Sequence, residues 1–259
     1  MTEKPMTVDQ YDPWLHEDSD VAALVMRQYL APVEGKDAVI FPPTYTLDDT
    51  EVGGRFKAGE APPGVYKGSK GPYGYNIDRY GDGMTVCQID SIGSQANRME
   101  PIFKKSDTRD LVPQVVVSAH GHEVNLLDAG HRAADAIVRF SDLWEEIEEA
   151  FRKIKEEGDA RPMAKLAPTS LVFGAWDSRA TQTKLPRLLR SVIRAYGVRP
   201  LHRSAQYIPP LSYVDEEILD EPSGKAQQSS MSELGLSHAP APWTHGGVLV
   251  DGEIRRDAT

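Results

Sequence analysis

The sequence has very little cysteine and no long apolar run. Cys87 is the single cysteine among 259 residues, so an intramolecular disulfide and a zinc site built from several cysteines are excluded. The longest apolar run near the N-terminus covers residues 21–26, far short of the ~18 residues of a membrane-spanning helix. Residues 1–20 are acidic and polar and show no secretory signal pattern. We therefore expect a cytoplasmic protein with no membrane partner.

Common catalytic motifs are also missing. The chain has no G-x-x-x-x-G-K-[ST], no G-x-G-x-x-G after a strand, no G-x-S-x-G and no H-E-x-x-H. His120, His122, Asp128 and His131 lie within twelve residues and are of types that bind metals, but their spacing matches no established metal site. We expect no metal and no cofactor. General acid–base catalysis by one of these histidines is an alternative.

Positive charge is scarce overall but concentrated in one segment. The net charge is −10, yet residues 161–207 contain nine basic residues and a single acid, Asp177, which gives this segment +8 and leaves −18 for the rest. The basic residues are Arg161, Lys165, Arg179, Lys184, Arg187, Arg190, Arg194, Arg199 and Arg203. Because a polyanion responds to the local field, this basic segment can bind nucleic acid. Pairing with the chain's own acidic helices is the alternative.

Hydrophobic patterns predict an α+β fold. Strands are expected at 84–90, 111–119, 123–127 and 169–176, with a turn at His120-Gly121. Helices are expected at 93–105 and from 132 to 157, where an apolar stripe (Leu143, Ile147, Phe151, Ile154) faces the core and Gly158 ends the helix. This β-α-β-β-α-β order is that of ferredoxin-like and RNA-recognition-motif domains, and predicts a palm core over 84–176.

Further elements are expected around this core. The patterns predict helices at 20–30 and 186–196, a short strand at 38–41, and a hairpin joining 248–250 to 253–255 through Asp251-Gly252. Arg187, Arg190 and Arg194 would then share one helical face and could follow a line of phosphates.

The remaining segments complete a single elaborated domain over 1–259. Residues 44–83 are predicted to be an inserted loop with few regular elements, since 53–83 hold nine glycines and four tyrosines. Residues 221–234 are rich in Ser and Gln and are interpreted as a mobile linker. Since the chain stops on the second strand of a predicted hairpin, we expect it to be truncated at its C-terminus.

The segment 91–100 follows a predicted strand and carries Gln95, Asn97 and Arg98 in the first turns of the next helix. A helix N-terminus offers free N–H groups, which suit phosphate or sugar contacts, whereas an ordinary capped helix is the alternative. The predicted strands 84–90 and 123–127 lack the aromatic residues on which RNA-recognition motifs stack bases. RNA is therefore expected at helix N-termini, at the basic segment or at the Gly/Tyr-rich insertion.

Four strings of the sequence stand out together: FPPTY at 41–45, IDSIGSQANRME at 89–100, LLDAGHRAADA at 126–136 and PTSLVFGAWDS at 168–178. They resemble the RAMP backbone subunit of type I-G (formerly type I-U) CRISPR surveillance complexes, with GGVLVDGEIRRDA at 246–258 as a further match. The family usually continues past this last string. The resemblance implies an RNA-recognition-motif-like palm with inserted finger and thumb loops. Either 53–83 or 221–234 could serve as the finger or thumb.

The same resemblance implies a non-catalytic subunit that oligomerises along guide crRNA and presents it for pairing with target DNA. Its partners would be the crRNA, further copies of itself and other CRISPR-associated subunits, and it would need no cofactor. The candidate RNA-binding residues are Gln95, Asn97, Arg98, His131, Arg132, Ser178, Arg179, Lys184, Arg187 and Arg190. Asp177 is interpreted as structural.

Two other functions stay open at this point. An RNA endoribonuclease of the same fold could use His120, His122, His131 or Asp177 with a metal. An unrelated soluble enzyme would purify without bound nucleic acid.

Overall fold

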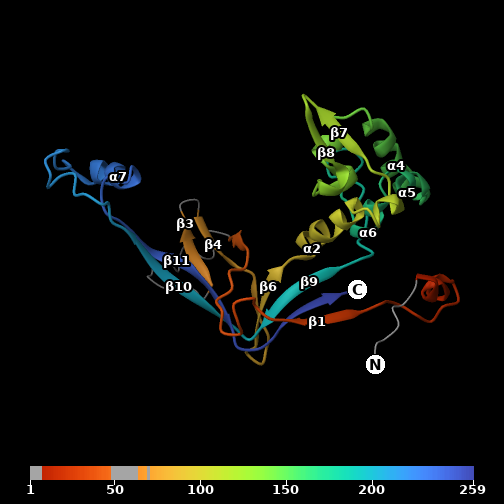
Figure 1. Ribbon diagram of the computed structural model, residues 1–259, viewed down its shortest axis with the longest axis horizontal. Coiled ribbons are helices and arrows are strands. Elements are labelled where there is room, and N and C mark those ends of the chain that lie inside the picture. The colour runs from red at the N-terminus through yellow and green to blue at the C-terminus, as the bar shows by residue number, and fades with distance from the viewer. Residues whose placement is uncertain (1–7, 48–63, 69–70) are drawn as a thin grey trace. The chain divides into compact units, whose positions relative to one another are not determined.

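The computed structural model describes residues 8–47, 64–68 and 71–259, and it confirms the predicted α+β class (Figure 1). The described chain divides into two compact units. The first, the helical unit, contains residues 8–28, 90–193 and 256–259. The second, the strand unit, contains 29–47, 64–68, 71–89 and 194–255. We describe each unit by itself.

The helical unit holds helices α2 to α6. They are α2 (Ile92–Met99), α3 (Ala136–Arg139), α4 (Trp144–Glu157), α5 (Arg161–Leu166) and α6 (Pro168–Phe173). Short 3-10 turns occur at η1 (Val8–Gln10), η2 (Asp12–Leu15), η3 (Glu100–Lys104), η4 (Arg109–Leu111), η5 (Leu126–Asp128) and η6 (Arg132–Ala134). No helix in the described part of the chain is long and apolar enough to cross a membrane.

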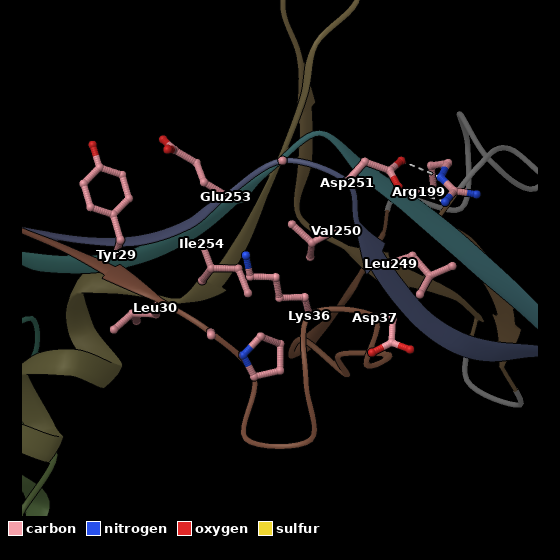
Figure 2. A pocket seen from close by; sticks show the side chains of 13 residues that line it. Tyr29, Leu30, Lys36, Asp37, Arg199, Leu249, Val250, Asp251, Glu253 and Ile254 are labelled. Carbon is pink, nitrogen blue, oxygen red and sulfur yellow. Dashed lines mark hydrogen bonds and ion pairs between the residues drawn. The ribbon is translucent and has the colours of Figure 1, made fainter.

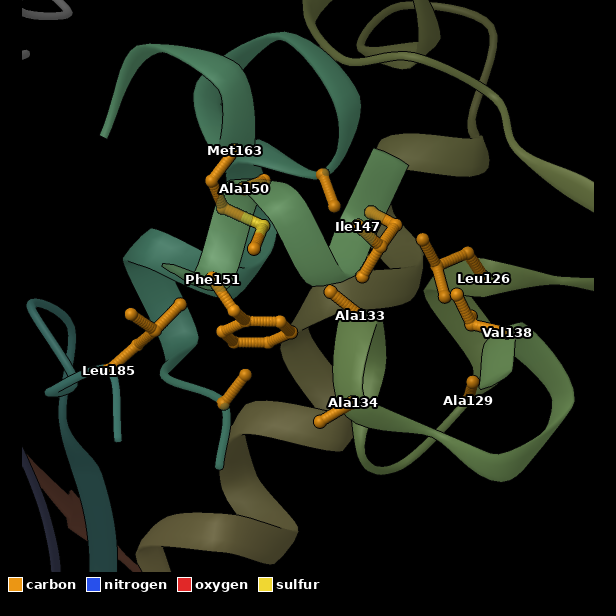
Figure 3. Packing of buried hydrophobic residues seen from close by; sticks show 12 residues of the cluster. Leu126, Ala129, Ala133, Ala134, Val138, Ile147, Ala150, Phe151, Met163 and Leu185 are labelled. Carbon is orange, nitrogen blue, oxygen red and sulfur yellow. The ribbon is translucent and has the colours of Figure 1, made fainter. Parts of the chain in front are cut away.

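The core of the helical unit forms around α4 (Figure 3). Ile147 and Phe151 are fully buried, and Leu143 and Ile154 pack against the same cluster, as the apolar stripe predicts. Full burial of a side chain such as Ile147 or Phe151 contributes about 1.5–3 kcal/mol. Gly158 ends the helix with a φ of 69° and donates its N–H to Ile154, which confirms the predicted C-terminal signal.

The predicted hairpin after α2 is present in the helical unit. Strands β7 (Val116–Ala119) and β8 (His122–Asn125) pair antiparallel, and the turn between them places His120 and Gly121 at positive φ. The two strands form their own two-stranded sheet. The predicted strand at 84–90 is confirmed as β6 (Thr85–Asp90), and the predicted helix at 93–105 as α2 with η3.

A five-stranded sheet has the order β1-β12-β9-β6-β5. Its other strands are β1 (Met26–Leu30), β5 (Ile77–Arg79), β9 (Ser191–Tyr196) and β12 (Ile254–Ala258). Strand β5 pairs antiparallel with β6, with Ile77 opposite Cys87.

The strand unit contains a long antiparallel ribbon of β10 (Val198–Tyr207) and β11 (Ala239–Val250) (Figure 1). Helix α7 (Lys225–Glu233) lies at the far end of this ribbon in Figure 1, within the segment interpreted as a mobile linker. A three-stranded sheet has the order β2-β4-β3, from β2 (Thr44–Thr46), β3 (Val65–Gly68) and β4 (Gly71–Tyr75).

Most of the described residues of segment 44–83 therefore lie in strands β2 to β5, where few regular elements were predicted. Residues 48–63 and 69–70 of this segment lie outside the described residues. The physical reason for the difference is the tyrosines, which favour strands and pack together. Tyr66 is fully buried, its ring lies within 6 Å of those of Tyr73 and Tyr75, and its hydroxyl donates to the Leu201 carbonyl at 2.9 Å. Burial raises the pKa of Tyr66 far above its ordinary value.

Two element predictions near the basic segment are wrong. Residues 169–176 were predicted as a strand, but 169–173 lie in helix α6 and 174–176 begin a loop in which Trp176 forms an isolated bridge. Pro168 starts the helical turn and Gly174 ends it at φ 79°. Residues 186–196 were predicted as a helix, but strand β9 occupies Ser191–Tyr196 and no helix covers 186–190. The β-branched pair Val192-Ile193 favours a strand. Consequently Arg187, Arg190 and Arg194 do not form a helical face.

Three other predictions are also wrong. In place of the predicted helix at 20–30, strand β1 covers Met26–Leu30 and residues 20–25 form no regular element. In the expected strand at 38–41 only Ile40 forms an isolated bridge, with Val248. The residues around Asp251-Gly252 do not form a hairpin, since β11 pairs with β10 while β12 joins the five-stranded sheet. The turn instead packs on the turn at Gly197, where the Asp251 N–H donates to the Gly197 carbonyl at 2.9 Å.

Candidate nucleic-acid interface

The segment 174–190 of the helical unit, here called the basic loop, connects α6 to β9. Its two arms pair with each other: the Leu185 N–H donates to Ala175 at 2.7 Å and the Asp177 N–H to Thr183 at 3.0 Å. Trp176 and Lys184 form an antiparallel bridge between these bonds. A Cβ at Gly174 would lie 2.7 Å from Cγ of Arg187, so only glycine fits at the start of the loop.

Asp177 anchors the tip of the basic loop. Its fully buried carboxylate accepts hydrogen bonds from the N–H groups of Arg179 (3.3 Å), Ala180 (3.2 Å) and Thr181 (2.7 Å), and from the Thr181 hydroxyl (2.8 Å). Arg139 Nη2 lies 3.2 Å away and balances the charge. Burial alone would raise the pKa of Asp177, but these hydrogen bonds outweigh burial and hold the pKa below its ordinary value. The carboxylate therefore fixes the turn.

Four cations of the basic loop face solvent. The side chains of Arg179, Lys184, Arg187 and Arg190 are exposed, and none forms an ion pair with an acid in the described part of the chain. Lys184 Nζ lies 6.0 Å from the ring centroid of Trp176, which is 59% exposed. Ser178 is half-buried, and its carbonyl accepts a bond from Gln182 at 2.7 Å. The loop thus presents positive charge and one aromatic ring together.

Arg132 stabilises the base of the loop from inside. Only 3% of Arg132 is exposed, and its guanidinium contacts the Glu100 carboxylate at 2.7 Å, the Gly174 carbonyl at 3.1 Å and the Asn97 side-chain oxygen at 3.0 Å. Burial lowers the pKa of Arg132 and raises that of Glu100, because both charges have left water. Arg132 and Asn97 therefore hold α2, η6 and the start of the basic loop together.

The structure does not bring the other candidates to the loop surface. Gln95 is 6% exposed, donates to Asp90 at 2.5 Å and accepts from the Ser191 hydroxyl at 3.0 Å. Arg98 is exposed but forms an ion pair with Asp90 at 3.0 Å. His131 is exposed, and its backbone N–H donates to Asp135 at 3.2 Å. Contact of any of the ten candidates with RNA stays a prediction.

The histidine-rich segment lies at the β7–β8 hairpin and beyond it. His120 and His122 are exposed at the hairpin turn, and His120 has a φ of 50°. Among the residues that the structure describes, no group of three His, Cys, Asp or Glu side chains could hold a metal ion.

An open groove of about 800 Å³ lies in the strand unit (Figure 2). The sequence reasoning missed this groove because strands distant in the chain form it. Its charged side chains are three carboxylates and two cations: Asp37, Asp251, Glu253, Lys36 and Arg199. The dashed contacts in Figure 2 join Arg199 to Asp251 at 2.6 and 2.8 Å. A lining with more acids than bases does not suit a polyanion, so the basic loop is the better nucleic-acid interface.

Trp176 is a surface residue that the sequence reasoning did not single out. The signal was present, since a tryptophan directly precedes Asp177 inside the basic segment.

A comparison with protein families supports a CRISPR-associated protein, as the resemblance implies. A search of curated proteins finds no match. The family model described as CRISPR-associated protein GSU0053 matches residues 24–200, which include α2, the helical core and the whole basic loop. Since this match covers more than half of the chain, the protein belongs to this CRISPR-associated family.

Proposed function

We propose that this protein is a non-catalytic, RNA-binding backbone subunit of a type I-G CRISPR surveillance complex. In this proposal the exposed cations of the basic loop hold the phosphates of the guide crRNA. The observation that carries the proposal is the set of four solvent-facing cations on one loop without acid partners in the described part of the chain. Membership of a CRISPR-associated family supports it.

The proposal includes assembly along the guide in the cytoplasm, with further copies of the chain and other CRISPR-associated subunits as partners and target DNA reached through the guide. Exposed apolar side chains support a protein contact near strand β1. All five residues of β1 are exposed, and Leu24, Val25 and Val33 beside it are 58%, 64% and 105% exposed. An edge strand with such neighbours is typical of an interaction surface.

The proposal excludes catalysis by Asp177. Its support is the turn itself: both carboxylate oxygens of Asp177 accept hydrogen bonds from the protein, and the side chain is fully buried. The test is incubation of end-labelled RNA with the purified protein, with and without Mg²⁺ or Mn²⁺. Intact RNA in all samples is expected. Cleavage that disappears in Asp177→Asn or His131→Ala would establish the endoribonuclease alternative.

The salt dependence of RNA binding tests the phosphate contacts. The dissociation constant of a fluorescein-labelled single-stranded RNA would be measured by anisotropy between 50 and 300 mM NaCl. For single strands the log–log slope is about −0.7 per phosphate neutralised, so Arg187→Ala/Arg190→Ala should reduce its magnitude by about 1.4. The slope should not depend on RNA sequence.

Arg161→Ala is the matched control for this experiment. It removes one positive charge from the same basic segment, but Arg161 already forms an ion pair with Asp159 at 2.8 Å. Its slope should equal that of the unmodified protein. If the double variant also keeps the unmodified slope, Arg187 and Arg190 do not contact phosphate and the proposed interface is wrong.

A further inference from the structure

The basic loop carries an aromatic side chain that charge alone does not explain. Trp176 is 59% exposed, although tryptophan is usually well buried in a folded chain. It is held in place, because its backbone bridges to Lys184 and the next residue is the anchored Asp177. An indole on a fixed turn loses little conformational freedom when a ligand packs against it.

The surroundings of Trp176 indicate which ligand it fits. Lys184 Nζ lies 6.0 Å from the ring centroid, in the range of a cation–π contact, and Arg179, Arg187 and Arg190 are exposed on the same loop. A protein partner with an apolar surface would have to remove these charges from water, which is unfavourable without matching acids. A nucleotide offers both complementary groups: a base with a π face and a phosphate.

We propose that Trp176 stacks on an unpaired base of the bound strand, so that the basic loop prefers single-stranded RNA to duplex RNA. This inference rests on the proposed function and adds the form of the RNA. In a duplex the bases are stacked on one another and closed to an exposed indole, whereas in a single strand a base can swing out onto the ring. Stacking is tolerant of sequence because every base has a π face.

The experiment compares Trp176→Leu and Trp176→Phe in the full chain, using a labelled 12-nucleotide single strand and the duplex of the same sequence. Stacking measured by substitution corresponds to roughly a 5- to 150-fold change in affinity per base. Trp176→Leu should weaken single-strand binding within that range and leave duplex binding within about twofold. Trp176→Phe keeps an aromatic ring and should recover most of the affinity.

Leu188→Ala is the matched control, because Leu188 is an apolar side chain of the same loop and is 72% exposed. It should bind both RNAs as the unmodified protein does. The salt slope of Trp176→Leu should also be unchanged, because no phosphate contact is lost. This separates the inference from the proposed function, whose failure would appear as an unchanged slope in Arg187→Ala/Arg190→Ala.

Three results would overturn the inference: equal loss of affinity for single strand and duplex, no loss with Trp176→Leu, or no recovery with Trp176→Phe. Light scattering of the RNA-free protein gives the remaining outcome. If Trp176→Leu changes self-association but not RNA affinity, the ring belongs to a protein contact and the stacking role is refuted.

Discussion

Replacing Arg132 by methionine is expected to remove much of the stability of the helical unit. Arg132 is 3% exposed and its partner Glu100 is 1% exposed, so the substitution leaves a carboxylate buried without its cation. Breaking a buried pair in this way costs about 3–5 kcal/mol. The backbone at position 132 has a φ of 55°. Arginine and methionine both have an unbranched Cβ, so the cost of this conformation is the same in the two proteins and cancels in the comparison.

The loss of stability includes further hydrogen bonds of Arg132. The guanidinium of Arg132 also donates to Gly174 and Asn97, and these oxygens lose a partner as well. Whole domains are stable by only about 5–15 kcal/mol, so the variant should unfold at clearly lower urea concentration. Arg152→Met is the control: Arg152 is half-exposed beside Glu149 on α4, and losing such a pair should cost less than about 1 kcal/mol.

The pH dependence gives a second readout for the same variant. Burial raises the pKa of Glu100 in the folded protein, and without Arg132 this pKa rises further. A carboxyl whose folded pKa lies above its unfolded value takes up a proton on folding, so the stability of the variant rises as pH falls. The deficit of Arg132→Met relative to the unmodified protein should therefore be smaller at pH 5 than at pH 8.

Urea unfolding followed by far-ultraviolet circular dichroism at the two pH values measures both effects. The double variant Glu100→Gln/Arg132→Met removes the unpaired charge and should recover much of the loss at pH 8. A deficit below about 1 kcal/mol, or one that grows as pH falls, would refute the argument that a buried charge is left behind. Failure of the double variant to recover would refute it too.

Two further substitutions test the anchoring of the basic loop. Asp177→Ala should lower the free energy of unfolding by about 3 kcal/mol, since several hydrogen bonds to a charged group are lost. The ionised Asp177 carboxylate stabilises the fold above the ordinary aspartate pKa, and this stabilisation is lost as pH falls through its lowered folded pKa. Asp177→Asn should therefore flatten the acid limb of a stability–pH curve. Gly174→Ala forces a Cβ to within 2.7 Å of Arg187 Cγ at a φ of 79°, and should cost about 1–3 kcal/mol in urea unfolding. Because Arg187 must move, the RNA affinity of the Gly174→Ala variant should fall as well. An unchanged affinity would mean that Arg187 does not contact RNA.

Long periodic patterns in the sequence predicted the fold where local forces decide it. Helix α4 has an apolar stripe over about three turns and a terminal glycine, and the structure has a helix there at Trp144–Glu157. The first part of the predicted helix, 132–143, instead forms η6 and the separate short helix α3. The β7–β8 hairpin follows from a β-branched run and a two-residue turn. In both cases neighbours in sequence are also neighbours in space, so the pattern contains the contacts that stabilise the element.

Short apolar runs could not be predicted in the same way. Residues 168–173 read equally well as a buried strand or a buried helix, and the six-residue run gave no period to separate them. In 186–196 the apolar spacing matched a helix, yet Arg190 exchanges backbone hydrogen bonds with Thr259 at 2.9 and 2.8 Å. That partner lies 69 residues further along the chain, so long-range pairing overrides the local pattern.

The sequence predicted which residue types form the candidate site, but it did not predict which of these side chains are buried and which are exposed. Arg132 and Gln95 belong to the matched strings, but contacts with Glu100 and Ser191 place both inside the helical unit. Spacing along the chain says nothing of burial at such distances. The cations at 179, 184, 187 and 190 were predicted from the basic segment and from their place at or after the end of the matched string at 168–178, and they are exposed on the loop.

The charge of the basic segment can now be divided into paired and available parts. Of its nine cations, Arg161 and Arg199 form ion pairs with acids outside the segment, Asp159 and Asp251, and the other seven have none among the described residues. Ion pairs with the chain's own acids therefore neutralise only a small part of the positive charge of this segment. Asp177, the single acid of the segment, is buried against Arg139 and does not offset the exposed cations.

This division sets a numerical limit on RNA binding by the basic loop. If each of its four free cations neutralises one phosphate, the salt slope per subunit is about −2.8. A slope near that value would mean that the loop accounts for the electrostatic part of binding. A much steeper slope would mean that cations outside the basic loop also contact the strand, and Lys165 of α5 is an exposed cation of the same unit with no ion pair among the described residues. Lys165→Ala would then flatten the slope, while a slope of −2.8 leaves that variant unchanged.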